Sequence, residues 1–224
     1  MIATSLKARP PCHICQIDGA AKVNINDNVA SRKLPLDISD AFVAEVLKPY
    51  RPNAKYLKSA QITHLSDKTS TENSAKDSAF VAGTGRFAIP ESCYIDDTGH
   101  FNAVEFNICY NQLAYVVFGK CIEAGILQKL NSELQKLSDE KANVLSLSMV
   151  DYKRHQLPSM LIVSIEGVRF FKQLKSGDFR GELTINRVAP VGGAFFFFTT
   201  IAFSDAEGVK AKGSVVLAFV PPKD

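Results

Sequence analysis

Hydrophobic residues recur at helical spacing from Asn102 to Gly125, and they leave little polar surface on any side of that segment. Its apolar positions are Val104, Ile108, Cys109, Leu113, Val116, Val117 and Ile122. Asn102 can accept a hydrogen bond from the first turn, and Glu105 can reach back to the N–H of Asn102. The pattern therefore predicts a long helix that is buried on most sides. Asn107, Tyr110, Asn111 and Tyr115 lie on the same turns, and each must find an internal partner or face a substrate.

Amphipathic helical spacing recurs in two further segments. The segment Asp37–Tyr50 has one apolar stripe, with Ser39 as the candidate N-cap and Tyr50 at the very end. Leucines spaced three to four residues apart follow Gly125 and predict an extra surface helix within residues 127–142. The pattern of Val144–Tyr152 fits a short helix and an extended segment equally well.

Alternating and β-rich runs predict the strands. They are Ala60–Leu65, Ala79–Ile89, Met160–Lys172, Phe179–Val188, Ala194–Ser204 and Val209–Val220. Because the last four follow one another along the chain, we expect them to form an antiparallel meander. One sheet wrapped around one buried helix fits this order, so we predict an α+β protein of the hot-dog architecture. A general α+β sandwich is the second interpretation.

Residues 1–36 contain scattered prolines and asparagines, and we predict a loosely ordered N-terminal arm before a single domain of residues 37–224. The arm holds a Cys-x-x-Cys pair, Cys12 and Cys15. A structural zinc site needs four ligands, and no second pair follows at finger-like spacing. We therefore expect reduced, unliganded thiols, with neither metal nor cofactor in the protein.

Composition narrows the class of protein. A net charge of +3 over 224 residues is too small to indicate nucleic-acid binding. Five cysteines at irregular spacing do not indicate a disulfide framework. The first residues lack the apolar core of a signal peptide, and no apolar run reaches membrane-spanning length. We expect a cytoplasmic protein without membrane insertion.

Three stretches carry a family resemblance. Glu91–Glu105, Cys109–Tyr115 and Tyr152–Leu161 together resemble the FcoT-like family of hot-dog proteins, and the similarity runs from about Asp37 to the C-terminus. The Leu127–Asp139 segment departs from the family. The resemblance implies either a long-chain fatty acyl-CoA thioesterase or an enzyme that adds glycine to an enoyl-acyl carrier protein in isonitrile lipopeptide biosynthesis. It also implies a homodimer or higher homo-oligomer, because hot-dog sheets usually join edge to edge.

The family's proposed site has two tyrosines and two asparagines in place of a nucleophile. By resemblance, these roles fall on Tyr50, Tyr94, Asn102 and Asn111. Hydrolysis and conjugate addition both build negative charge on the thioester carbonyl oxygen, where fixed donors and a helix N-terminus stabilise it. Glu105 is a second-rank candidate for a general base, since the helix N-terminus favours its ionised form, and capping is an equally good role.

Four further residues are candidates for substrate binding. His100, within Gly99-His100-Phe101, can orient the loop; a dehydratase role would need a later acidic partner that is missing here. Arg154, His155 and Ser159 are the nearest candidates by sequence to bind the carboxylate of a second substrate such as glycine. The alternative is a solvated Arg154 and a His155 that closes a turn.

Three functions follow from these residues. We expect first the hydrolysis of fatty acyl thioesters, carried by coenzyme A or acyl carrier protein, through direct attack by water. No Gly-x-Ser-x-Gly or Cys-His motif indicates an acyl-enzyme. The alternative is conjugate addition of glycine or a similar amino acid to a 2-enoyl-acyl carrier protein. The third is a non-catalytic acyl-binding module.

Overall fold

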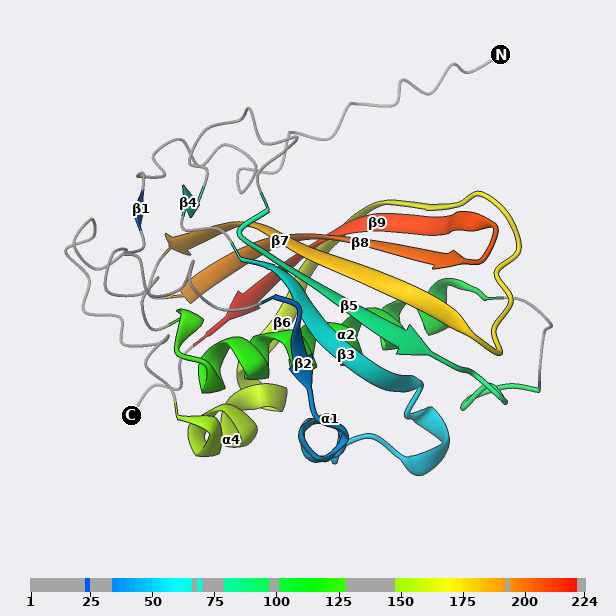
Figure 1. Cartoon of the computed structure of the whole chain (residues 1–224), viewed down its shortest axis with the longest axis horizontal. Coiled ribbons are helices and arrows are strands. Elements are labelled where there is room, and N and C mark those ends of the chain that lie inside the picture. Colours follow the sequence, from blue (N-terminus) through cyan, green and yellow to red (C-terminus); the bar gives the residue numbers. More distant parts are fainter. Residues whose placement is uncertain are drawn as a thin grey trace, which may run out of the picture.

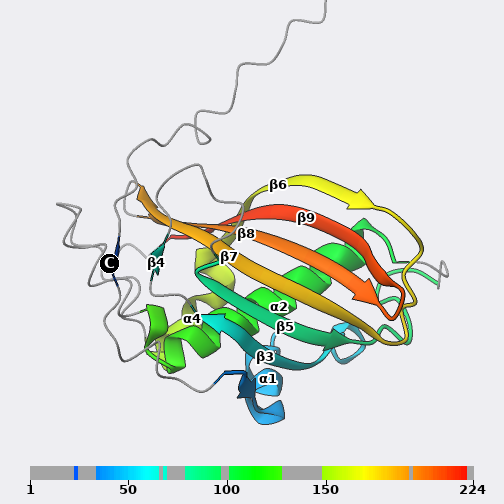
Figure 2. The same ribbon diagram turned by 45° about the horizontal axis from the view of Figure 1, so that its top comes forward.

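A computed structural model shows one curved sheet packed on one long helix (Figures 1 and 2). It describes residues 34–65, 79–96, 101–127, 148–191 and 194–220, together with the backbone of 23–24 and 68–69. The helices are α1 (Asp40–Val46), η2 (Pro52–Ala54), α2 (Ala103–Glu123) and α4 (Met149–Ser159). The main sheet holds β2 (Leu36–Ile38), β3 (Leu57–Leu65), β5 (Val81–Phe87), β6 (Met160–Phe170), β7 (Phe179–Val191), β8 (Ala194–Asp205) and β9 (Gly208–Phe219). Two short strands, β1 (Val23–Asn24) and β4 (Lys68–Thr69), pair separately.

The main sheet is antiparallel throughout and has the order β2-β3-β5-β7-β8-β9-β6. The predicted meander is confirmed for β7, β8 and β9. It is wrong for β6, which pairs with β9 at the far edge. The reason is that β5 pairs with the first half of β7, so that edge of β7 is already occupied. The chain leaves α4 directly into β6 and then crosses to the other side of β8 and β9.

The predicted first helix is shorter than expected. Leu36–Ile38 forms a strand that pairs with β3, and helix α1 covers only Asp40–Val46. The cap is confirmed, since the Ser39 hydroxyl accepts from the N–H of Phe42 at 3.3 Å. Lys48 precedes a proline, which disfavours helical backbone at that position, so the helix stops before it. Tyr50 therefore lies beyond the helix and not at its last turn.

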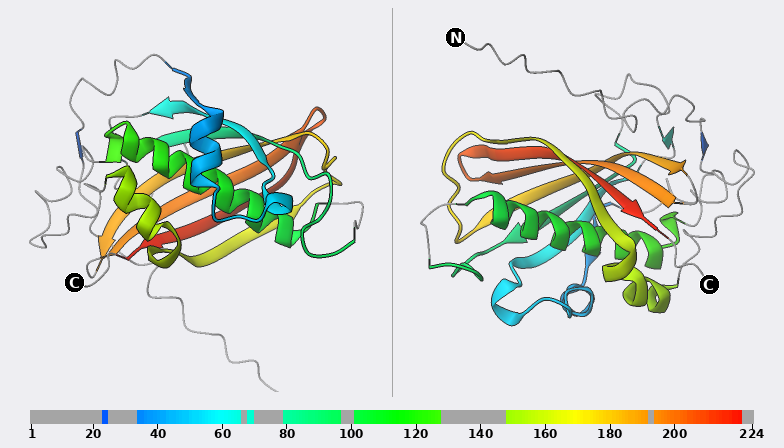
Figure 3. Two further views of the ribbon diagram at one scale, coloured as in Figure 1. Left: turned by 90° about the horizontal axis from the view of Figure 1, so that it is seen from below. Right: turned by 180° about the vertical axis from the view of Figure 1, so that it is seen from behind.

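Helix α2 is the centre of the core, as the sequence predicts. One side packs on the concave face of the sheet, while α1 and α4 cover part of the opposite side (Figure 3). The rings of Phe101 and Phe106, just before and just inside the helix, lie 6.4 Å apart. This contact fixes the angle at which the chain enters α2. The sheet and its central helix confirm the hot-dog architecture.

Close packing fixes the distance between α2 and its neighbours. A methyl group at Gly83 of β5 would come within 2.5 Å of the Val117 side chain on α2. A methyl group at Gly119 of α2 would lie 3.0 Å from the Tyr152 ring on α4 and 3.3 Å from the Phe42 ring on α1. These glycines allow the sheet and both short helices to approach the central helix closely.

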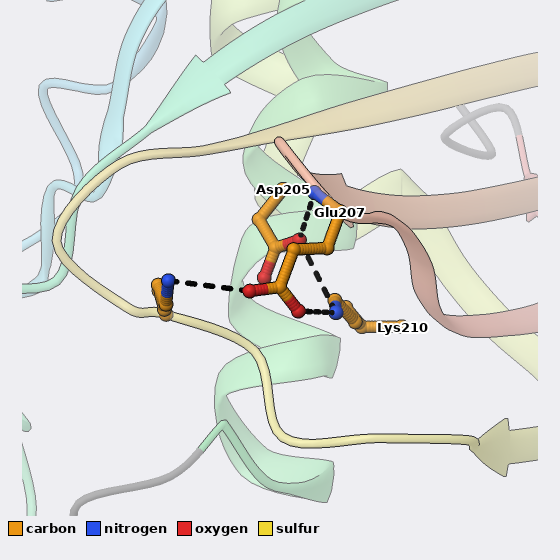
Figure 4. A network of polar contacts seen from close by, with 4 residues as sticks. Asp205, Glu207 and Lys210 are labelled. Carbon is orange, nitrogen blue, oxygen red and sulfur yellow. Dashed lines mark hydrogen bonds and ion pairs between the residues drawn. The ribbon is translucent and has the colours of Figure 1, made fainter.

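A partly buried ion cluster stabilises the turn between β8 and β9 (Figure 4). The ammonium of Lys210 lies 2.8 Å from a Glu207 oxygen and 3.4 Å from an Asp205 oxygen. The side chains of Lys210 and Asp205 are only 2% and 4% exposed. Lys175, from the connection between β6 and β7, reaches Glu207 at 3.4 Å. The cluster therefore links that connection to the β8–β9 hairpin.

Several predictions concern segments that the structure does not describe. The extra helix predicted within 127–142, His100, and the pair Cys12 and Cys15 lie outside the described residues. The boundary between an arm of 1–36 and a domain of 37–224 stays a prediction. Within the described residues, no helix is long and apolar enough to cross a membrane, and no cluster of side chains is suited to hold a metal ion.

Candidate active site

The start of α2 is held by a complete capping box. The N–H of Asn102 donates to the Glu105 carboxylate at 3.0 Å, and the Asn102 side-chain oxygen accepts from the N–H of Val104 at 2.8 Å. The same Asn102 oxygen also accepts a hydrogen bond from the N–H of Glu105, the third residue of the helix. The cap thus occupies backbone donors that a substrate oxygen would otherwise meet. Donors for a substrate must come mainly from side chains here.

Tyr94 and Asn102 supply such a donor. The Asn102 side-chain nitrogen donates to the Tyr94 hydroxyl oxygen at 2.7 Å. That bond leaves the hydroxyl proton of Tyr94 free to donate to a substrate. A hydroxyl that accepts one hydrogen bond also becomes a stronger donor in the next. Tyr94 is 48% exposed, so an incoming thioester can reach its hydroxyl.

Glu105 lies on the inner side of this pair. Its side chain is 4% exposed, and one oxygen is already bound to the N–H of Asn102. These contacts favour the capping role over that of a general base. Behind it, burial and then the neighbouring Glu105 charge raise the pKa of the Cys109 thiol. Cys109 is therefore a protonated core residue and not a nucleophile.

A half-exposed stripe runs along α2 from its first turn. Val104 is 44% exposed, and Ile108, Asn111 and Tyr115 are half-buried. Their spacing of three to four residues places them on one face of the helix. The side chain of Asn111 has no hydrogen bond with any of the described residues. The sequence predicts Asn111 as a site residue, and its place on this open stripe leaves its amide available to a ligand.

Tyr50 lies against the same stripe. Its ring centre is 6.5 Å from that of Tyr115. Burial, followed by the nearby Tyr115 and Cys109, raises the pKa of Tyr50, so its hydroxyl stays protonated at neutral pH. Asn102 and Asn111 are nine residues apart, which corresponds to about 13 Å of helix rise. One carbonyl oxygen cannot contact both amides, so the candidate site has two parts.

The third family-like stretch lies on α4, beside the middle of α2. The Tyr152 hydroxyl donates to the carbonyl oxygen of Tyr115 at 2.7 Å. On that helix Arg154 is exposed, His155 is half-buried and Ser159 is buried. None of the hydrogen bonds among the described residues joins these three side chains to Tyr94 or Asn102. Their predicted role in binding a substrate carboxylate stays a prediction.

The structure adds polar groups that the sequence pattern did not single out as site residues. The Ser92 hydroxyl and the Asn107 side-chain oxygen are buried and have no partner among the described residues. Ser92 lies two residues before Tyr94, and Asn107 lies one helical turn before Asn111. Buried polar atoms without partners are uncommon, and a ligand would satisfy them. The sequence signal for Asn107 was its polarity on an otherwise apolar helix.

The chain matches one protein family and is similar to several named proteins. The model of a family described as the FcoT-like thioesterase domain matches residues 45–219. The chain is 34% identical to a (2E)-enoyl-[ACP] glycyltransferase of Streptomyces coeruleorubidus over 81% of this chain and 96% of that protein. It is 35% identical to a protein of the same name from Mycobacterium tuberculosis, over 81% of this chain and 86% of that one. A solved mutant thioesterase from Pseudomonas aeruginosa has a TM-score of 0.42 at 10% identity, over 85% of this chain and 98% of that one.

Proposed function

This chain belongs to the FcoT-like thioesterase family, and from this membership we propose that it adds glycine to a 2-enoyl thioester on an acyl carrier protein. The observation that carries the proposal is its similarity, over 96% of the relative's length, to a (2E)-enoyl-[ACP] glycyltransferase. The sequence placed thioester hydrolysis first and this addition second. The named relatives reverse that order. Hydrolysis remains the second candidate, because the family model is described as a thioesterase domain.

The addition needs charge stabilisation more than it needs a nucleophilic side chain. The amine lone pair attacks the β carbon, and the pair of the carbon–carbon double bond moves to make an enolate on the thioester oxygen. A proton then leaves the nitrogen and one is added to the α carbon, so the thioester stays intact. We assign the enolate oxygen to the Tyr94 hydroxyl, which Asn102 holds at 2.7 Å. One such donor is typically worth 10²–10³ in rate, or about 3–4 kcal/mol.

The site suits an amine better than water. Water must lose a proton to attack a thioester at neutral pH, and the nearby carboxylate, Glu105, is buried and bound to the helix cap. The ammonium group of glycine must also lose a proton before attack, but the neutral amine that results is a far stronger nucleophile than water and loses its second proton only after attack. Asn111 lies about 13 Å along α2 from Asn102. It would therefore contact another part of the acyl substrate, as would Tyr50, whose ring lies beside that of Tyr115.

The test is to supply the protein with saturated and 2-enoyl thioesters on a carrier protein, each with and without glycine. We expect the enoyl substrate to gain the mass of one glycine while no free thiol appears. The Tyr94→Phe variant should reduce this rate by about 10²–10³. Thiol released from the saturated thioester without amine would instead establish hydrolysis. Binding without any turnover would leave the acyl-binding module as the function.

We further propose that two copies of the chain pair through β6. β6 is an edge strand of the sheet, and its Leu161, Val163 and Ile165 side chains are 48%, 39% and 44% exposed. An exposed apolar edge strand invites pairing with another strand. Val104, in the first turn of α2, is also 44% exposed. Joining two β6 edges would pair their free backbone groups and extend the sheet across the dimer, and side chains of the partner would cover the apolar face of β6. A cytoplasmic location stays a prediction.

A further inference from the structure

One buried chain of hydrogen bonds leads from α2 to the loop that carries Tyr94. It begins at Gln112, whose side chain is 0% exposed. The Gln112 side-chain oxygen accepts from the N–H groups of Tyr56 and Leu57 at 3.0 and 2.9 Å. Its side-chain nitrogen donates to the carbonyl oxygen of Ala54 at 2.5 Å. One glutamine thus satisfies three backbone groups in the connection between η2 and β3.

The chain continues through the ring of Tyr56, which is 1% exposed. Its hydroxyl oxygen accepts from the N–H of Cys93 at 2.8 Å. Cys93 directly precedes Tyr94. The backbone at Tyr94 is therefore tied to the central helix through Tyr56 and Gln112, while the Tyr94 hydroxyl is tied to the helix cap through Asn102.

We infer that Tyr56 and Gln112 are positioning residues, which hold Tyr94 where its hydroxyl meets the substrate oxygen. Tyr94 lies in an irregular segment before α2 and is 48% exposed, so packing alone does not fix its side chain. A donor in an active site must be placed to within a fraction of an ångström, and a shift of 1 Å can cost about 10² in rate. This inference rests on the proposed role of Tyr94.

The Tyr56→Phe variant removes the acceptor of the Cys93 N–H and keeps the ring. Tyr110→Phe is the matched control, because Tyr110 is also fully buried and its hydroxyl is bound to Thr199 at 2.8 Å, on the sheet side of α2. We expect Tyr56→Phe to lower kcat for glycine addition about tenfold or more, with the KM for the thioester within about twofold. Tyr110→Phe should keep kcat near the wild-type value, whatever it costs in Tm.

A double-mutant cycle separates positioning from general stability. In a Tyr94→Phe background, adding Tyr56→Phe should reduce kcat little further, because the two changes act on the same group. An equal loss in both backgrounds would overturn the inference. So would equal losses of kcat in Tyr56→Phe and Tyr110→Phe.

Hydrogen exchange tests the same link without any substrate. The Cys93 amide should exchange about tenfold or more faster in Tyr56→Phe than in the wild type, and at the wild-type rate in Tyr110→Phe. Unchanged exchange at Cys93 would overturn the positioning role even if the enzyme is active. A wild-type protein that shows no glycine addition would contradict the proposed function, while the exchange result would still decide whether Tyr56 holds this loop.

Discussion

Asn102 has two separable roles, and a single substitution can remove one role while it keeps the other. Its side-chain oxygen caps α2 through the N–H of Val104 at 2.8 Å, and its side-chain nitrogen holds the Tyr94 hydroxyl at 2.7 Å. Asn102→Asp keeps the capping oxygen and loses the N–H donor. The new carboxylate would accept the Tyr94 hydroxyl proton, so that proton would no longer be available to a substrate.

The two substitutions should change stability differently but lower the rate alike. Loss of an N-cap side chain costs about 0.5–2 kcal/mol, and each 1 kcal/mol corresponds to about 2–4 °C in Tm for a protein of this size. Asn102→Ala should therefore lower Tm by a few degrees. Asn102→Asp should keep or raise Tm, because a carboxylate at a helix N-terminus is favourable by about 0.3–1 kcal/mol. Both should lower kcat/KM by about 10²–10³, the cost of one lost donor.

The assay pairs Tm, measured by circular dichroism, with glycine addition to a 2-enoyl thioester followed by mass. Tyr94→Phe is the matched variant, since it removes the hydroxyl and leaves the cap intact. Combining it with Asn102→Asp should cost little more than either alone, because both act on one donor. If Asn102→Asp kept its turnover within about threefold, Tyr94 would not be the donor that Asn102 holds. If turnover fell only in proportion to Tm, Asn102 would be a cap and nothing else.

Three further substitutions test the packing of the core, the ion cluster at the β8–β9 turn and the proposed dimer interface. Gly83→Ala should destabilise the protein by about 1–3 kcal/mol in urea unfolding, because its methyl would lie 2.5 Å from the Val117 side chain of α2. Gly177→Ala is the control and should leave stability unchanged, because no atom lies within 4 Å of its added methyl. Lys210→Met should lower Tm more than Asp178→Asn, because the Arg86–Asp178 ion pair is 63–65% exposed while Lys210 is buried. Equal Tm values for the two variants would show that the Lys210 cluster contributes no more than a surface ion pair. Hydrogen bonds and charges raise the pKa of Lys210, so its contribution is present below about pH 10 and lost as pH rises through the higher folded pKa. Burial raises the pKa of the partner Asp205, but hydrogen bonds and the charge of Lys210 outweigh burial and lower it. The contribution of the ion pair to stability is therefore also lost in strong acid, below about pH 4. The Tm difference between wild type and Lys210→Met should shrink at both extremes of pH. Ile165→Lys should convert a dimer to a monomer in light scattering, and an unchanged mass would exclude β6 as the interface.

The sequence alone predicted the local features of this protein. The apolar pattern and the Asn102 and Glu105 signals predicted a long buried helix and its cap, because capping and helical spacing depend on residues a few positions apart. The strand predicted at Ala194–Ser204 is also local in origin, since alternate residues of a strand point to opposite faces: Phe195 and Phe197 are buried, whereas Phe196 and Phe198 are half-buried. The resemblance located Tyr94 and Asn102, which the structure brings to one hydrogen bond.

Tertiary structure decided what depends on distant contacts. Leu36–Ile38 has no long strand pattern of its own, and it is a strand because β3 supplies its partner. The place of β6 depends on which edge β7 leaves open, a choice that periodicity cannot encode. Gln112 looked like one more polar residue on a buried helix; only the fold brings Ala54, Tyr56 and Leu57 to it across more than fifty residues. The sequence determines where a helix starts and which side chains could stabilise charge, whereas the fold determines what holds them in place.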